Sequence, residues 1–162
     1  MNNKFKFFSL VFSYPSIETL SQIRSIADEI PHYRSMAERI LTMPLEDVQT
    51  EYTKLFVTDH PRLHCPPYES YYREGTVYGN SSVEVRELYE KFGLEYSFEG
   101  EPPDHISVEL EFLSLTEDLE FARRMMEWVP EFARRVKESS VIYGVFAEEL
   151  VKLLSEFVNG DF

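Results

Sequence analysis

Residues 101–129 limit the folds open to this chain more than any other stretch. Two prolines, Pro102 and Pro103, lead into Asp104, a residue type that accepts hydrogen bonds from the free amides of a helix's first turn. Apolar residues then recur at steps of three and four, which is the spacing of one helical face. They are Val108, Phe112, Leu115, Leu119, Ala122, Met126 and Val129. The pattern predicts a long helix from about residue 104 to residue 129.

This predicted helix is apolar on more than one side. Ile106, Leu110 and Leu113 lie about 160° from the first stripe, because each residue turns a helix by about 100°. A helix with two apolar sides must be covered on both of them. We therefore expect it at the centre of a helical bundle.

The rest of the chain also divides into helical segments. Prolines separate these segments at Pro15, Pro31, Pro44 and Pro130. Ser16 and either Ser81 or Ser82 are suited to cap helices, and Gly93 is suited to end one. The chain contains no alternating β-branched run typical of a strand. We predict an all-α fold, a single domain over residues 1–162 built as a bundle of seven or eight helices.

Helical spacing fails between Thr58 and Asn80. Loops longer than about 12 to 15 residues are uncommon in compact domains and are usually functional or disordered. This one contains four tyrosines, whose large rings favour burial. We therefore expect an ordered loop that packs across the bundle.

The charge balance excludes some partners. Sixteen basic and 29 acidic residues give a net charge of −13, which repels nucleic acid and anionic lipid but attracts a cationic peptide. No stretch approaches the roughly 18 apolar residues that membrane insertion requires. A single cysteine, Cys65, cannot form an internal disulfide, in agreement with a reducing compartment. We predict a cytoplasmic protein.

One candidate site is a metal centre. Asp59, His60, His64 and Cys65 crowd the long loop, and His105 and Glu109 lie one helical turn apart. The alternative function is therefore a metal-dependent enzyme that uses His60, His64, His105 and Glu109. The stronger interpretation is that His105 and Glu109 pair with each other or with loop amides.

Other chemistry has little support in the sequence. Cys65 precedes two prolines in an acidic chain, which does not favour a reactive thiolate. Glycine-rich phosphate loops are absent from the sequence. We predict no catalytic residue and no cofactor.

A peptide-binding surface is the stronger candidate. The tyrosine-rich loop and the acidic segment from Glu101 to His105 would lie over a helical scaffold that leaves an apolar groove between them. An amphipathic or apolar helix docks in such a groove through apolar side chains. Surrounding carboxylates would receive basic side chains. The opposing interpretation is that the tyrosines only pack the loop down.

Three sequence blocks resemble those of a known family. They are Glu51–Phe56, Pro66–Tyr71, and Glu101–Ile106 followed by Glu109–Leu113. Their order and residues are similar to the TorD/DmsD/NarJ group of redox-enzyme maturation chaperones. The resemblance implies an all-helical, non-catalytic chaperone. It would bind the twin-arginine signal peptide or the apo catalytic subunit of a molybdenum or tungsten (molybdopterin) oxidoreductase before export or assembly. Homo-oligomerisation stays open.

The resemblance also implies which residues bind the peptide. Asp104 and His105 correspond by motif position to the family's signal-binding residues. The residues flanking them in the site are Glu101, Pro102, Pro67, Tyr68 and Glu69. We expect guanidinium groups to contact Asp104, Glu101 and Glu69, while the apolar part of the peptide lies on loop tyrosines, including Tyr71 and Tyr72.

His105 allows a further hypothesis. An unperturbed histidine has a pKa of about 6.5, and neighbouring carboxylates would raise it, so His105 could change charge when a peptide arrives. The alternative, that His105 only braces the loop, is the interpretation we favour.

Overall fold

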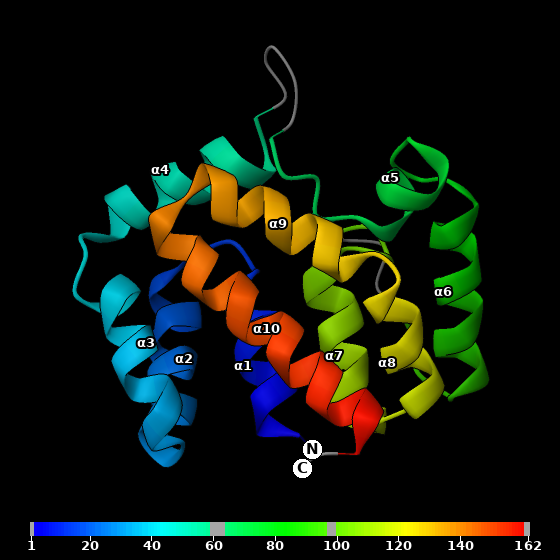
Figure 1. Ribbon diagram of the computed structural model, residues 1–162, viewed down its shortest axis with the longest axis horizontal. Helices are drawn as coiled ribbons and strands as arrows, with labels where there is room; N and C mark the ends of the chain where they lie inside the picture. The colour runs from blue at the N-terminus through cyan, green and yellow to red at the C-terminus, as the bar shows by residue number, and fades with distance from the viewer. Residues whose placement is uncertain (1, 59–63, 97–99, 161–162) are drawn as a thin grey trace.

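The computed structural model describes residues 2–58, 64–96 and 100–160, and within these ranges the chain forms ten helices and no strand (Figure 1). The helices are α1 (Asn3–Val11), α2 (Ile17–Glu29), α3 (Pro31–Leu41), α4 (Leu45–Phe56), α5 (Glu69–Glu74), α6 (Asn80–Lys91), α7 (Ile106–Thr116), α8 (Leu119–Met126), α9 (Val129–Ser139) and α10 (Val141–Asn159). The all-helical fold class is confirmed. The expected number of seven or eight is too low, for two reasons.

First, the long helix expected over residues 104–129 is three helices, α7, α8 and the start of α9. Glu117 adopts a left-handed conformation with φ of 50° and ends α7, and Asp118 starts α8 by accepting a hydrogen bond from the Phe121 amide at 2.9 Å. The apolar stripe runs across this break in the sequence, but Leu115 and Leu119 beside it are 54% and 38% exposed. Periodicity alone could not reveal that these two residues leave the core.

Second, the segment predicted as a loop contains the short helix α5. It ends at Gly75, whose φ of 79° is one that residues with a β-carbon rarely adopt. The next helix, α6, is not capped by Ser81 or Ser82 as expected. The Glu74 carboxylate instead accepts hydrogen bonds from the Ser81 amide at 2.8 Å and the Ser81 hydroxyl at 2.7 Å. Short helices capped by other segments leave no periodic signal.

Three other helix boundaries lie where the sequence predicts them. Ser16 accepts a hydrogen bond from the Thr19 amide at 3.0 Å and starts α2, and Pro31 is the first residue of α3. Gly93 follows α6 with a φ of 78°.

α9 and α10 approach each other closely at Gly144, where an added β-carbon would lie 3.2 Å from the Lys137 α-carbon.

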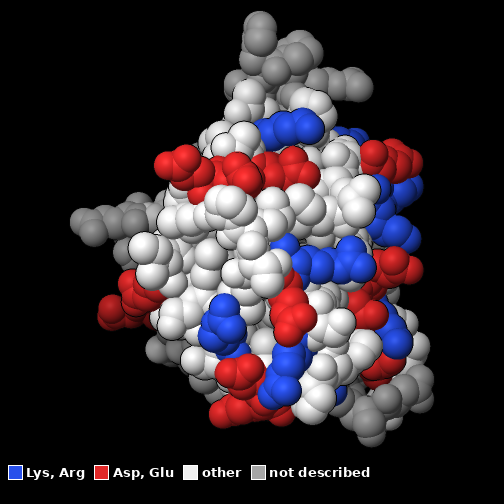
Figure 2. All heavy atoms as spheres, turned by 90° about the vertical axis from the view of Figure 1, so that its left-hand side faces the viewer, with Lys and Arg blue, Asp and Glu red and all other residues white. Residues whose placement is uncertain are grey.

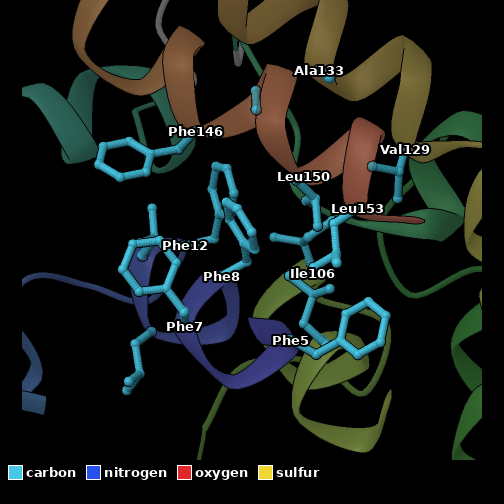
Figure 3. Packing of buried hydrophobic residues seen from close by; sticks show 14 of the residues in the cluster. Phe5, Phe7, Phe8, Phe12, Ile106, Val129, Ala133, Phe146, Leu150 and Leu153 are labelled. Atoms are coloured by element: carbon cyan, nitrogen blue, oxygen red, sulfur yellow. The ribbon is translucent and has the colours of Figure 1, made fainter. Parts of the chain in front are cut away.

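The centre of the bundle is α1. It packs against α2, α7 and α10, with α2 to α4 on one side of it in Figure 1 and α5 and α6 on the other. Phe5, Phe7 and Phe8 of this helix, and Phe12 that caps its C-terminal end, are at most 1% exposed. Figure 3 shows them against Ile106 of α7 and against Phe146, Leu150 and Leu153 of α10. Small residues allow α1 to approach α7, where the Ser9 hydroxyl donates to the Ser107 carbonyl at 2.7 Å.

The surface on the side of α3 and α4 has mixed charge. Figure 2 shows acidic and basic side chains interspersed there, separated by uncharged surface. The net negative charge is therefore not concentrated as one acidic patch on this face. Within the described ranges, each helix is too short or too polar to serve as a membrane span.

Candidate peptide-binding site

Two of the sequence blocks meet in the structure at the start of α7. Tyr68 and His105 form an antiparallel backbone bridge. The Ile106 amide donates to the Pro67 carbonyl at 2.8 Å, and the Glu69 amide donates to the Asp104 carbonyl at 3.1 Å. The predicted association of these blocks is therefore present, through backbone contacts between residues 35 or more positions apart.

Asp104 lies inside this junction, with none of its surface exposed. Its Oδ2 accepts a hydrogen bond from the Ser70 amide at 2.7 Å, so it caps α5 and not α7 as expected from the sequence. Its Oδ1 is buried and has no hydrogen-bond partner among the described residues. In this conformation Asp104 cannot touch a peptide on the surface.

His105 is the cap of α7. It is 2% exposed, and its Nδ1 accepts a hydrogen bond from the Ser107 amide at 3.1 Å. Nδ1 is therefore unprotonated, and the neutral ring carries its proton on Nε2, which faces Glu101 Oε2 at 3.9 Å. Burial lowers the pKa of His105 to about 3. The expected rise in pKa is wrong, and the favoured bracing role fits this geometry.

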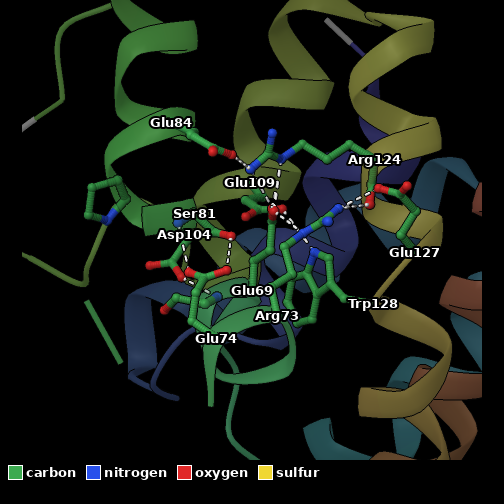
Figure 4. Close-up of polar contacts among 12 residues, drawn as sticks. Glu69, Arg73, Glu74, Ser81, Glu84, Asp104, Glu109, Arg124, Glu127 and Trp128 are labelled. Carbon is green, nitrogen blue, oxygen red and sulfur yellow. Dashed lines mark hydrogen bonds and ion pairs between the residues drawn. The ribbon is translucent and has the colours of Figure 1, made fainter. Parts of the chain in front are cut away.

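Glu69 is buried and fully engaged by arginines of its own chain (Figure 4). Arg73 Nε lies 2.6 Å from Glu69 Oε2, and Arg124 Nη2 lies 2.7 Å from the same oxygen. These arginines also pair with Glu127 and Glu84 on the exposed side of the cluster. A peptide arginine would have to displace one of them, so Glu69 serves here to fix α5 against α8.

Glu109 lies beside this ion pair cluster but has no arginine of its own. Its Oε1 accepts a hydrogen bond from Trp128 Nε1 at 3.3 Å, and its Oε2 is buried without a hydrogen-bond partner. Burial, with the nearby Glu69 carboxylate, raises the pKa of Glu109 well above its usual range. Both effects favour the neutral form of this carboxyl in the folded protein.

The remaining predicted residues are partly or fully covered. Pro67 and Pro102 are buried, and Tyr68 is half-buried with its ring edge-on to the His105 ring at 5.3 Å. The Arg135 guanidinium lies over the rings of Tyr71 and Tyr72, with its Cζ 5.5 and 5.4 Å from the two ring centres. Glu101 stands out among the predicted carboxylates, because its side chain is 49% exposed.

Next to Glu101 the surface forms a groove of about 370 Å³. Its apolar floor and its acidic rim come from the end of α6, the following segment and α7. The floor consists of Tyr89, Leu94, Tyr96, Val108, Phe112 and Leu115, and the rim of Glu95, Glu101 and Glu111. The sequence reasoning identified only Glu101 of these as a site residue. Leu115 is an apolar residue that lines the groove and is exposed. Its exposure is visible only in the structure.

The metal-site alternative receives no support from the described residues. Among them, no three His, Cys, Asp or Glu side chains are placed to hold an ion. His105 and Glu109 do not face a common point, because His105 caps α7 while Glu109 contacts Trp128. His64 is exposed, and Asp59 and His60 lie outside the described residues.

Comparison with known proteins decides the family. The nitrate reductase delta subunit family matches residues 22–136. The chain belongs to this family. The match includes α5, α6 and α7, and hence both halves of the junction and the whole groove. No curated protein matches the chain.

A solved structure agrees with this membership. The chain is 45% identical to a protein from Archaeoglobus fulgidus described as a redox enzyme maturation protein, with a TM-score of 0.88. The alignment covers 96% of this chain and 94% of the other. A member of the nitrate reductase delta subunit family with this fold is thus similar over nearly its whole length to a maturation protein.

Proposed function

We propose that this chain is a cytoplasmic maturation chaperone for a redox enzyme. In this proposal it binds the twin-arginine signal peptide, and the apo form, of a molybdopterin oxidoreductase catalytic subunit. Family membership and the similarity to a redox enzyme maturation protein support the general role. The identity of the leader and of the molybdenum or tungsten client is the part that we add.

The groove is the observation that carries the proposal. An apolar floor between Leu94 and Leu115 suits the hydrophobic stretch of a leader, and the rim of three glutamates suits its basic residues. All three glutamates are exposed, and Glu111 is already paired with Lys6 at 3.1 Å. Charge-assisted hydrogen bonds of this kind contribute about 1.5 to 3 kcal/mol each when partly shielded from water.

The buried residues take a supporting role in this proposal. Asp104 holds α5, and His105 holds α7 and the Tyr68 ring, so together they fix Glu101 at the rim of the groove. The chain performs no bond-making step and takes no cofactor. Binding of the leader delays export or assembly until the client is complete.

The groove can be tested with a substitution that leaves charge unchanged. Leu115→Asn should weaken binding of a synthetic twin-arginine leader about tenfold or more, because the floor loses the apolar contact of a half-exposed leucine. Isothermal titration calorimetry measures this. Unchanged affinity in Leu115→Asn, or no binding by the parent protein, would contradict the proposal.

Val141→Asn is the matched control. Val141 is 82% exposed at the start of α10 and does not line the groove. It should bind the leader like the parent protein, so any general effect of an added surface asparagine is measured separately.

A further inference from the structure

One carboxylate of the groove lies among its apolar residues. Glu111 follows Val108 by three positions on α7 and precedes Leu115 by four, so the three side chains share one face of the helix. Phe112 lines the groove beside them. An apolar peptide segment bound along this face would cover the Glu111 carboxylate, and covering an unpaired carboxylate costs free energy.

A lysine from α1 pairs with this carboxylate. Lys6 Nζ lies 3.1 Å from Glu111 Oε1, and the lysine side chain is 23% exposed. Among the described residues, no lysine or arginine pairs with Glu95 or Glu101, the other two glutamates of the rim. The lysine therefore neutralises the rim carboxylate that lies between Val108 and Leu115, and not the other two.

The ion pair belongs to a fixed contact between two antiparallel helices. On one side of it the Asn2 amide donates to the Ser114 carbonyl at 2.7 Å, and on the other the Ser9 hydroxyl donates to the Ser107 carbonyl at 2.7 Å. An isolated surface ion pair contributes little, partly because two long side chains must be ordered. Here the backbones that carry the two side chains are already held in register, so the lysine is positioned to stay on the glutamate.

We propose that Lys6 is a specificity-determining residue of the groove. By neutralising Glu111, its ammonium makes the middle of the groove accept the apolar stretch of a leader and reject a basic residue at the same place. This inference rests on the proposed function. Selection between partners needs a repulsive element as well as an attractive one, and Lys6 supplies the repulsion. The basic residues of the leader are then left to the other carboxylates of the rim.

Lys6→Met tests this assignment, because methionine keeps an unbranched side chain and loses the charge. Isothermal titration calorimetry compares two synthetic peptides, a twin-arginine leader and the same leader with one lysine in the middle of its apolar stretch. The parent protein should prefer the first peptide. In Lys6→Met the unpaired Glu111 should weaken binding of the first and strengthen binding of the second. The ratio of the two dissociation constants should therefore change at least about fivefold.

Three variants separate this effect from a general effect of charge. Lys54→Met is the matched control, because it changes the net charge equally but removes a lysine that pairs with Glu51 and lines a different hollow. It should keep the ratio of the parent protein. Lys6→Arg retains a cation and should also keep the ratio. Adding Glu111→Gln to Lys6→Met should abolish the gain for the lysine-bearing leader.

The outcomes distinguish this inference from the proposed function. An unchanged ratio in Lys6→Met, or an equal change in Lys54→Met, overturns the role of Lys6, while binding of the leader by the parent protein still supports the groove. If the parent protein binds neither peptide, the proposed function falls and this inference falls with it. Thermal melting checks the folding of each variant, and Lys6→Gln replaces Lys6→Met if the latter does not fold.

Discussion

At the scale of single residues, burial determines the charge of the groups around α7. His105 and Glu109 lie on the same helix end, and burial favours the neutral form of each. Their pKa values therefore move in opposite directions, down for the imidazole and up for the carboxyl. In the sequence, both residues belong to a short stretch with many ionisable side chains. Their exposure, and hence their protonation, depends on segments that are far away in the chain.

Glu109 has a predictable effect on stability. Because its pKa is raised in the folded state, the folded protein keeps a proton that the unfolded chain loses above about pH 4.3. Stability from this group is thus present at low pH and is lost as pH rises toward the folded pKa. Glu109→Gln should gain stability relative to the parent protein as the pH rises above the unfolded pKa, by up to about 1.4 kcal/mol per pH unit.

Urea unfolding at several pH values measures this difference. Glu120→Gln, on the exposed side of α8, serves as the control and should follow the parent protein throughout. A constant difference between Glu109→Gln and the parent over the same range would show that Glu109 is not held neutral.

At the scale of elements, neighbouring residues of one motif start different helices. Asp104 caps α5 through the Ser70 amide, and His105 caps α7 through the Ser107 amide. Helix existence could be predicted wherever the apolar spacing was regular and a proline or serine marked the start. That Asp104 caps α5 and not α7 could not be predicted, because a residue that caps a helix from another segment has no fixed spacing from that helix in the sequence.

This arrangement predicts two separable effects. Asp104→Ala should expose the amides of α5 to exchange about ten- to a hundredfold faster, because a buried cap is lost. His105→Ala should instead loosen the first turn of α7. Hydrogen exchange resolved by residue distinguishes them, and faster exchange in α7 but not in α5 for Asp104→Ala would contradict the assignment.

At the scale of the whole molecule, the core is built around α1. The sequence was sufficient for the all-α class, but it joined α7 and α8 into one long central helix and did not single out α1. The apolar stripe of residues 104–129 includes exposed Leu115 and Leu119, whereas the short α1 is buried by its four phenylalanines. Which apolar helix lies innermost is set by tertiary contacts with α7 and α10.

Loss of one α1 ring should therefore destabilise the entire protein. Phe8→Ala should lower the free energy of unfolding by about 3 to 5 kcal/mol, since the cavity would open in the middle of the bundle (Figure 3). Phe92→Ala, at a ring that is 45% exposed, should cost clearly less. Urea denaturation compares the two, and equal losses would place the core elsewhere.

The hydrogen bond between Ser9 and Ser107 spans 98 positions of the chain. During synthesis the phenylalanine-rich α1 leaves the ribosome long before α7 and α10, the helices that cover it. The apolar side chains of α1 therefore stay without their partners in a nascent chain until α7 and α10 have been synthesised.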